Sequence, residues 1–420
     1  MKNTVSLAIG FAIVVAATVQ ADEKKADDGF VPLFNGKDLT GWVNVNCHPK
    51  TFFVKEGMLI TTGKPTGFLR TAKQYENFIC EFEWMHMNKT AVGNSGFFVW
   101  GDPLPGVGSP FTRGIEVQVL VNLEYKDKKS GAITASSHGD VFSIQGATCK
   151  PDRPHPTGGL RCIPSEFRAK GGGEWNHYKI IANNGVIKLH VNGKEVSGVS
   201  ECKPRKGYLA FESEGAECRF KNVKIKELPS TNPKPEEIGE VDKGFTNLYT
   251  GLDLDNWLME FGHEGHWKPQ DSVLHYDGMS DADVKSLYVA KEYEDYELIV
   301  DWKFPPKKDV KSRPCGLLLR ETDDYLLTLT TRTDGKLVLM ESVDTKSTFL
   351  ADKEGIDVKP TGWNRTIITM KGGKLSATLN SKAILENVAL DKKSPKKGEV
   401  ALMHEGVEID FANVFIRELK

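Results

Sequence analysis

FVPLFNGKDLTGW, at residues 30–42, recurs as FTNLYTGLDLDNW at residues 245–257, and each landmark residue is shifted by 215 positions. A second segment, YENFICEFEW at residues 75–84, recurs as YEDYELIVDW at residues 293–302. A period of this length is far too long for the repeat of a solenoid, which spans about 20–50 residues. We therefore interpret the chain of 420 residues as a duplicated whole domain, and each copy is long enough to form its own core.

The second copy is shorter than the first. The offset between matching residues is 220 for Gly96 and Gly316 but falls to 188 for Trp175 and Trp363. A segment of the first copy, broadly residues 122–170, is therefore missing from the second. The residues that the second copy has lost indicate what the first copy does.

Short runs in which apolar and polar residues alternate recur between turn signals along both copies. Residues 78–84, 114–120 and 187–191 are examples, and the following pair Asn192-Gly193 is typical of a tight hairpin turn. The sequence shows no amphipathic pattern long enough for a helix of three turns. We expect an all-β fold of two concanavalin-A-like jelly-roll sandwiches.

Changes in composition divide the chain into four parts. Residues 1–21 have the features of a secretory signal peptide, in which Lys2 precedes an apolar run that is short for a membrane span. Residues 29–228 form the first predicted domain, residues 229–243 a Pro-rich polar linker, and residues 244–420 the second, degenerate domain. We expect an exported protein, periplasmic or extracellular, without stable membrane insertion once the signal is removed.

The net charge bears on nucleic-acid binding, and the cysteine content bears on disulfides. A net charge of -2 gives no electrostatic footprint for nucleic acid. Seven cysteines follow the export signal, so disulfides are chemically permitted, and Cys149–Cys162 and Cys202–Cys218 are candidate pairs. The sequence alone leaves the pairing open.

Strand periodicity directs several polar residues away from the core. In residues 114–120 every second residue is apolar, which leaves Glu116 and Gln118 on the outer face. The same alternation directs Glu212 and Glu214 outward. The non-core face of a curved jelly roll can form a groove, and such outward residues would line it.

The duplicate serves as an internal control for these residues. Its alignment pairs Asn94 with Pro314, Glu116 with Leu326, Gln118 with Thr328, Glu212 with Met403 and Glu214 with Glu405. Packing positions persist while most of the polar set is lost, which favours a functional role for Glu116 and Gln118, although drift of an exposed face would give the same result. Glu212 stays open between the two roles, and Glu214, which is kept, is interpreted as structural.

The segment that the second copy lacks is polar and rich in turns, and a loop of this length is usually functional or disordered. Its candidates for lining the groove are His138, Asp140, His155, Arg161, Glu166 and Arg168. For each of them a surface ion pair or a turn cap is an equally good interpretation. No tight ligand spacing such as that of H-E-x-x-H is present there, so we expect no metal cofactor, while calcium bound by carboxylates and carbonyls stays open.

Taken together, five short motifs resemble those of one family. They are LFNGKDLTGW at 33–42, NSGFFV at 94–99, EVQ at 116–118, GEWNH at 173–177 and FKNVKI at 220–225. On these motifs the chain is similar to the 3-keto-disaccharide hydrolase family, also described as 3-keto-glucoside lyase or hydratase domains. The resemblance covers about residues 30–228 and, as a divergent copy, residues 245–420. It implies a concanavalin-A-like jelly roll that acts on an oligosaccharide or glycoside already oxidised at sugar carbon 3.

The implied substrate suits a strand that offers Glu116 but a neutral Gln118. A double-displacement glycosidase needs two carboxylates, whereas a 3-keto group acidifies the hydrogen on carbon 2, so that one base can remove it. The aglycone then leaves by β-elimination and water adds to the unsaturated sugar.

We therefore expect Glu116 to be the base and His138, oriented by Asp140, to be the acid. The expected sugar-binding residues are Asn94, Arg113, Gln118, His155, Arg161, Glu166, Arg168 and Glu212, with Arg113 or Arg161 stabilising the enolate oxygen. The alternative is a lectin-like carbohydrate-binding or cell-surface protein without turnover, because a fold does not imply a function.

Overall fold

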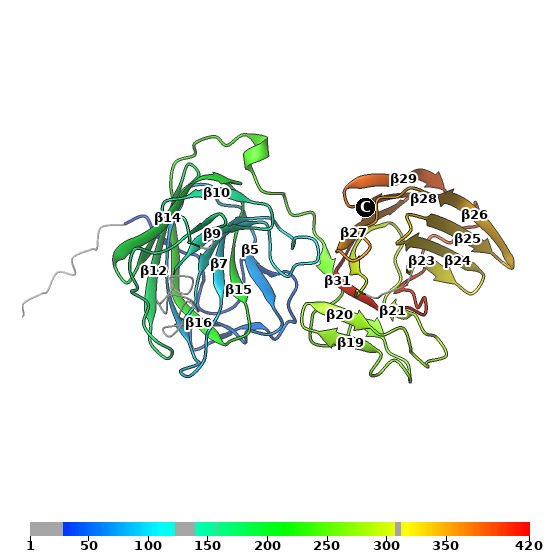
Figure 1. Cartoon of the computed structure of the whole chain (residues 1–420), viewed down its shortest axis with the longest axis horizontal. Coiled ribbons are helices and arrows are strands. Elements are labelled where there is room, and N and C mark those ends of the chain that lie inside the picture. The colour runs from blue at the N-terminus through cyan, green and yellow to red at the C-terminus, as the bar shows by residue number, and fades with distance from the viewer. Residues whose placement is uncertain (1–27, 122–138, 157, 307–311) are drawn as a thin grey trace, which may run out of the picture.

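The computed structural model describes residues 28–121, 139–156, 158–306 and 312–420. These residues form four antiparallel sheets, arranged as two β-sandwiches that lie side by side (Figure 1). In the described ranges the one helical element is a turn of 3-10 helix, η1 (Pro235–Glu237). The prediction of an all-β fold with two jelly-roll sandwiches is confirmed.

The first sandwich consists of sheets A1 and B1. Sheet A1 has the order β10 (Thr148–Pro151), β14 (Lys194–Lys203), β13 (Val186–Val191), β12 (Asn176–Asn183), β6 (Phe78–His86), β16 (Cys218–Glu227), β4 (Met58–Thr61) and β3 (Phe52–Lys55), with β1 (Val31–Pro32) paired to β16. Sheet B1 has the order β11 (Arg161–Cys162), β9 (Val141–Ile144), β8 (Gly114–Gln118), β7 (Gly96–Gly101), β15 (Tyr208–Ser213), β5 (Gly67–Thr71) and β2 (Trp42–Asn44).

The second sandwich repeats this arrangement in sheets A2 and B2. Sheet A2 has the order β19 (Trp267–Gln270), β20 (Val273–Tyr276), β31 (Ile409–Glu418), β22 (Tyr296–Lys303), β27 (Asn364–Lys371), β28 (Lys374–Leu379) and β29 (Lys382–Ala389), with β17 (Thr246–Asn247) paired to β31. Sheet B2 has the order β18 (Trp257–Leu258), β21 (Leu287–Val289), β30 (Glu399–Leu402), β23 (Pro314–Thr322), β24 (Tyr325–Arg332), β25 (Leu337–Val343) and β26 (Lys346–Lys353).

Aromatic side chains from facing strands fill the core of the first sandwich. The ring centroids of Phe82 and Phe97 lie 5.0 Å apart across the two sheets, and those of Phe211 and Phe220 lie 4.2 Å apart. All four side chains are fully buried. Because side chains alternate along a strand, these core positions direct their neighbours in β7, β8 and β15 to the outer face of sheet B1.

The strand register corrects the comparison of the two copies. Gly96 pairs with Gln118 and Phe98 with Glu116 in the first domain, and Gly316 pairs with Thr330 and Leu318 with Thr328 in the second. Glu116 therefore corresponds to Thr328, and the prediction of Leu326 was wrong by two residues, as was the match of Gln118. A shift of two residues keeps every side chain on its own face, so the alternating pattern could not reveal the error.

Sheet A2 packs its outer face against the outer face of sheet B1. The buried apolar side chains of this contact are Val45, Phe68, Phe98 and Ala210 of the first domain and Ile299 and Phe415 of the second. A polar network lies beside them. Asp301, fully buried, pairs with Arg365 at 2.6 Å and accepts a hydrogen bond from the backbone of Gly108 at 2.7 Å, while Asn413 donates to the carbonyl of Gly106 at 3.0 Å.

The segment predicted as a linker runs along the first domain. Asn77 donates a side-chain hydrogen bond to the carbonyl of Pro229 at 2.7 Å, and Gln74 donates to that of Gly239 at 2.9 Å. Arg70 forms an ion pair with Asp242 at 2.7 Å. These contacts fix the chain on the first domain up to the start of the second.

The expected signal peptide lies outside the described residues. Within the described ranges, no helix combines the length and the apolar character that crossing a membrane requires. All seven cysteines are buried and unpaired, so the two candidate disulfides were wrong. Cys202 and Cys218 lie on β14 and β16, and three other strands of sheet A1 separate these two.

Candidate functional site

Two buried carboxyl groups lie over β7 because residue 96 has no side chain. A Cβ atom on Gly96 would lie 2.7 Å from Oε2 of Glu212 and 2.8 Å from Oε1 of Glu116. The two glutamates come from β15 and β8, the neighbours of β7 on either side. A glycine at position 96 therefore lets both carboxyl groups lean over the strand between them.

The carboxyl cluster is buried, whereas the sequence predicted side chains that line an open groove. Glu116 is 5% exposed and Glu212 is 1% exposed, whereas Glu214, just beyond β15, is half-buried. Asp140 is fully buried beside them. The cluster therefore has a buried floor of Glu116, Glu212 and Asp140, and Glu214 lies nearer the surface.

A chain of hydrogen bonds links a guanidinium to Glu214. Arg161 donates from Nη2 to Oε1 of Gln118 at 3.0 Å, and Gln118 donates from Nε2 to Oδ1 of Asn94 at 2.8 Å. Asn94 in turn donates from Nδ2 to Oε2 of Glu214. The other arm of Arg161 donates from Nε to Asp140 at 2.5 Å. Each amide is oriented by its two partners, so the chain has one direction, from Arg161 towards Glu214.

The glutamates hold protons more tightly than free glutamate does. Burial, and then the charge of Glu214, raise the pKa of Glu116 to about 8, against the opposing effect of Arg161. Burial also raises the pKa of Glu212 well above its usual value, and so does the charge of Glu116. Glu116 and Glu212 are therefore protonated at neutral pH.

Glu214 differs from both neighbours. Burial also raises the pKa of Glu214 above its usual value, although hydrogen bonds with Glu212 and Asn94 oppose that shift. The hydrogen bond between the two carboxyl groups raises the pKa of Glu212 and lowers that of Glu214. Burial likewise raises the pKa of Asp140 to about 7, and the ion pair with Arg161 opposes that shift.

The structure brings together most of the expected site residues. Asn94, Glu116, Gln118, Asp140, Arg161 and Glu212 contact one another or share the cluster. His155 is buried beside them, and its backbone N–H donates to the carbonyl of Arg161 at 2.9 Å. Burial, and then the charge of Arg161, lower the pKa of His155.

Three expected residues lie elsewhere. Arg113 forms two hydrogen bonds with Asp102, at 2.6 and 2.9 Å, so its guanidinium is held by that carboxylate. Glu166 and Arg168 pair with each other at 3.0 Å, and Arg168 also donates to the carbonyl of Val191 at the end of β13. The prediction that these three residues line the sugar-binding groove was wrong, because their charged groups bind nearby side chains and the backbone at the end of a strand.

His138, the expected acid, lies outside the described residues. Asp140, its expected orienting partner, forms its ion pair with Arg161.

Sequence reasoning missed Gly96 and Glu214. The alternation in β15 placed Glu214 on the face of Glu212, but its survival as Glu405 suggested a structural role. Glu405 leans over Gly316 and accepts a hydrogen bond from Thr330 at 3.4 Å. Glu405 lacks the two carboxyl neighbours that surround Glu214. The second domain has therefore kept the glutamate but not its surroundings.

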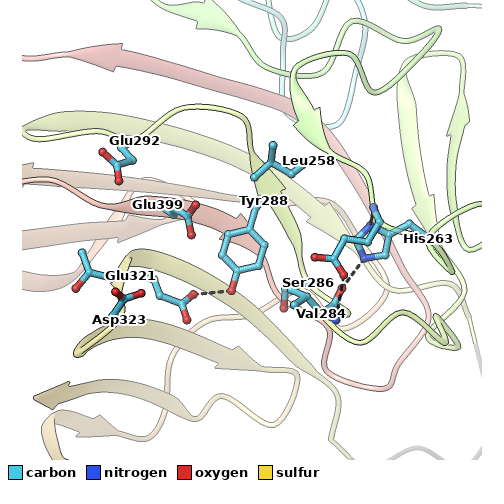
Figure 2. A pocket seen from close by; sticks show the side chains of 11 residues that line it. Leu258, His263, Val284, Ser286, Tyr288, Glu292, Glu321, Asp323 and Glu399 are labelled. Atoms are coloured by element: carbon cyan, nitrogen blue, oxygen red, sulfur yellow. Dashed lines mark hydrogen bonds between the residues drawn. The ribbon is translucent and has the colours of Figure 1, made fainter. Parts of the chain in front are cut away.

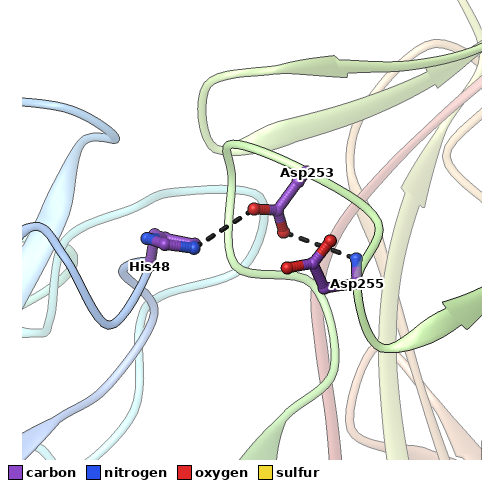
Figure 3. A group of neighbouring side chains, drawn as sticks. All are labelled: His48, Asp253 and Asp255. Carbon is purple, nitrogen blue, oxygen red and sulfur yellow. Dashed lines mark hydrogen bonds and ion pairs between the residues drawn. The ribbon is translucent and has the colours of Figure 1, made fainter.

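A second group of charged side chains lies between the domains (Figure 3). His48 of the first domain donates to Asp253 of the second at 3.1 Å, and Asp255 lies next to this pair. The backbone N–H of Lys50 donates to Nδ1 of His48 at 3.1 Å, so Nε2 carries the proton of the neutral ring. A metal would need that nitrogen deprotonated. The group therefore fits an interdomain hydrogen bond better than a metal site.

The second domain has an acidic hollow of about 560 Å³ on sheet B2 (Figure 2). Glu321 and Glu399 line it, together with Tyr288, whose hydroxyl donates to Glu321 at 2.5 Å. His263 closes one end and contacts the carbonyl of Val284 at 2.7 Å. The hollow has no counterpart of the Arg161 chain among its lining residues.

Comparisons with known proteins concern both domains. A profile of the 3-keto-alpha-glucoside-1,2-lyase-like domain matches residues 29–226 and again residues 244–417. A search of curated proteins found no match.

Several solved structures are similar to parts of the chain. A crystal structure from Parabacteroides distasonis, described as that of a glycosyl hydrolase, is 25% identical over 49% of this chain and 97% of that chain, with a TM-score of 0.38. A carbohydrate-binding module from Bacillus subtilis is 8% identical over 38% of this chain and 90% of that one, with a TM-score of 0.27. A lichenase from a mouse hindgut metagenome is 15% identical over 46% and 92%, with a TM-score of 0.29.

Proposed function

Because the chain belongs to the 3-keto-alpha-glucoside-1,2-lyase-like domain family and is a carbohydrate-active protein, we propose that its first domain cleaves 3-keto-glycosides. The substrate would be an oligosaccharide or glycoside whose sugar is already oxidised at carbon 3. The reaction would be elimination of the aglycone followed by addition of water, with net hydrolysis as the result.

The proposed chemistry needs a base and an acid in one place. A carboxylate removes the hydrogen on carbon 2, whose electrons form the double bond between carbons 1 and 2 as the bond from carbon 1 to the aglycone oxygen breaks. A carboxylic acid gives its proton to the departing oxygen. Water then adds its oxygen to carbon 1, the base returns its proton to carbon 2, and the acid takes the proton that water releases.

The observation that carries this proposal is the geometry of three neighbouring carboxyl groups, those of Glu116, Glu212 and Glu214, of which Glu116 and Glu212 lie directly over Gly96. The second domain keeps the glycine as Gly316 but has Thr328 and Met403 in place of Glu116 and Glu212. Buried carboxyl groups cost stability, so their presence in one copy alone favours a functional role over a packing role. We propose that the second domain is not catalytic.

The test is an assay with a panel of 3-keto-glucosides that release a measurable aglycone. Wild type should release the aglycone, and Glu116→Gln should release it at least about 100-fold more slowly, as expected for loss of an acid or a base. Glycosides without the keto group should not react. A lectin-like protein would instead bind glycans equally well in both forms and release nothing, which would end the enzyme proposal.

We also propose that the protein is exported, from the features of residues 1–21. The mature protein recovered from its host should begin at or near Asp22. N-terminal sequencing of the secreted or periplasmic fraction tests this, and an intact Met1 there would contradict it.

A further inference from the structure

We propose that Glu214, rather than Glu116, is the general base of the first domain, and that the chain Arg161–Gln118–Asn94 keeps it ionised. This inference rests on the proposed function and deepens it. It reverses the expected role of Glu116, which becomes the proton donor to the leaving group.

The hydrogen bonds of this chain run in one direction, from Arg161 to Glu214. Arg161 can only donate, so Gln118 must accept with its oxygen and donate with its nitrogen. Gln118 donates to the oxygen of Asn94, which leaves the amide nitrogen of Asn94 pointing at Glu214. A carboxylate satisfies that donor, and a neutral acid does so less well.

Glu212 and Glu214 form a neighbouring pair. Glu212 lies on β15 and Glu214 just beyond its end, two residues along the chain, and the hydrogen bond between them raises the pKa of Glu212 and lowers that of Glu214. Oε2 of Glu212 is buried and has no hydrogen-bond partner, which a neutral carboxylic acid tolerates far better than a carboxylate. The negative charge of the pair therefore belongs on Glu214.

The glutamates also differ in their exposure to solvent. Glu116 and Glu212 are 5% and 1% exposed, whereas Glu214 and Asn94 are only half-buried. Of the three glutamates, Glu214 is therefore the most accessible to a sugar. Glu116, behind Gly96, keeps its proton up to about pH 8 because burial raises its pKa to that value.

The described residues of the cluster around Glu214 come from several elements. Glu212 lies on β15, Glu116 on β8 and Arg161 on β11, while Asp140 immediately precedes β9 and Asn94 lies two residues before β7. Among these five residues Arg161 is the one cation, and Asp140 balances it as a direct ion pair. Arg161 therefore acts on Glu214 through the two amides, which makes Asn94 and Gln118 positioning residues.

The decisive experiment follows hydrogen exchange at carbon 2 of a 3-keto-glucoside in D₂O, together with aglycone release. Loss of the base should abolish both, so Glu214→Gln should slow exchange and release alike by about 100-fold or more. Loss of the acid should spare the first step, so Glu116→Gln should still exchange the hydrogen while release is lost. The opposite pattern would make Glu116 the base and overturn the inference.

Glu405→Gln is the matched control, because Glu405 occupies the same position in the second domain. It should leave both rates unchanged. Asn94→Leu removes the donor to Glu214 and should move the acidic limb of the kcat/KM profile to higher pH. A purely structural role for Asn94 would lower the rate without moving that limb.

A measurement without substrate separates this inference from the proposed function. Carbon-13 labelling of the glutamate carboxyl groups in the full-length protein, with titration by NMR, reports the charge of each group. At pH 7 we expect Glu214 to be ionised and Glu116 and Glu212 to be protonated. A neutral Glu214 beside an ionised Glu116 would overturn the inference even if 3-keto-glucosides are cleaved. The expected charges without any turnover would leave the inference standing and remove the proposed function.

Discussion

Glu116, Glu212 and Glu214 lie close together on sheet B1. Because Glu116 and Glu212 are buried, the chain takes up protons when it folds. Glu116 and Glu212 each give up hydration on folding, and Arg161 directs its hydrogen bonds to Asp140 and Gln118. The folded chain therefore avoids the cost of two buried charges by keeping both groups neutral. This arrangement ties the stability of the first domain to pH.

The pH dependence of stability follows from Glu116. Burial raises the pKa of this carboxyl from 4.5 to about 8, so the folded state binds more protons than the unfolded state between these values. The free energy of unfolding is then highest below pH 4.5 for this group and falls as the pH rises to about 8. Glu116→Gln should make that slope shallower by up to about 1.4 kcal/mol per pH unit.

Urea unfolding at a series of pH values measures this slope. Glu174→Gln, at an exposed position, is the control and should leave it unchanged. An identical slope in wild type and Glu116→Gln would contradict the buried, neutral state of this residue.

Removal of Arg161 should be far more costly than removal of a surface cation. Arg161→Met leaves Asp140 fully buried without its partner, and at pH 8 the loss should reach about 3 kcal/mol or more. The loss should shrink at pH 5, because burial raises the pKa of Asp140 to about 7 and the lone carboxyl then takes up a proton.

Lys150→Met is the matched control, since Lys150 and Glu201 form an ion pair whose side chains are 71% and 70% exposed. Its loss should change the free energy of unfolding by at most about 1 kcal/mol. Asp140→Asn added to Arg161→Met should recover part of the stability. Equal losses for Arg161→Met and Lys150→Met would contradict the buried ion pair.

At the scale of elements, alternation along β8 and β15 was enough to predict which side chains leave the core. It predicted the outer face of Glu116, Gln118 and Glu212 because period two is a property of any half-buried strand. It could not fix the register between the copies, since a slip of two residues preserves the pattern. Arg113 and Arg168 escaped prediction for another reason: Asp102, across the connection between β7 and β8, binds Arg113, and Glu166 and the end of β13 bind Arg168, and alternation along a strand does not predict such contacts.

The loop between β7 and β8 offers a test at this scale. Gly108 has a φ of +63° and lies directly on Trp363 of the second domain, so an added Cβ would overlap that ring. Gly108→Ala should lower stability and change the fluorescence of Trp363. Gly146→Ala is the control, because Gly146 has a φ of +89° with nothing within 4 Å of an added Cβ. Gly146→Ala should lower the free energy of unfolding by the backbone cost alone, about 1–2 kcal/mol. A similar loss for both variants would contradict the close contact between Gly108 and Trp363.

At the scale of the whole molecule, apolar and polar contacts join the two sandwiches. Phe68 and Phe98 meet Ile299 and Phe415, and Asp301 collects hydrogen bonds from both domains. Phe98 pairs with Glu116 in the sheet, so the docked face borders the acidic cluster. The second domain thus covers the part of sheet B1 beside the site, although it has lost the site itself.

Separation of the domains should follow from one substitution at the docked face. Ile299 is 5% exposed and corresponds to Glu81 of the first domain, so Ile299→Glu places an unpaired carboxylate in an apolar contact. With a protease site inserted in residues 229–243, cleaved wild type should elute from gel filtration as one species and cleaved Ile299→Glu as two. Phe349→Glu, at a position 66% exposed, is the control and should elute as wild type does. Two species from cleaved wild type would contradict a stable contact.

The same docked face limits how many modules a chain of this type can carry. The residues that correspond to Ile299, Ile367 and Phe415 in the first domain are Glu81, Lys179 and Lys224. In sheet B2, Glu260 and Ser286 take the places of Val45 and Phe68, while Leu318 and Ala401 stay apolar like Phe98 and Ala210. The apolar docking face of sheet A2 thus has no apolar counterpart in sheet A1, where the same positions are charged. A third module gained by another round of gene duplication would meet these charges at the outer face of sheet A1, so the chain could not extend at that end by repeating the same contact.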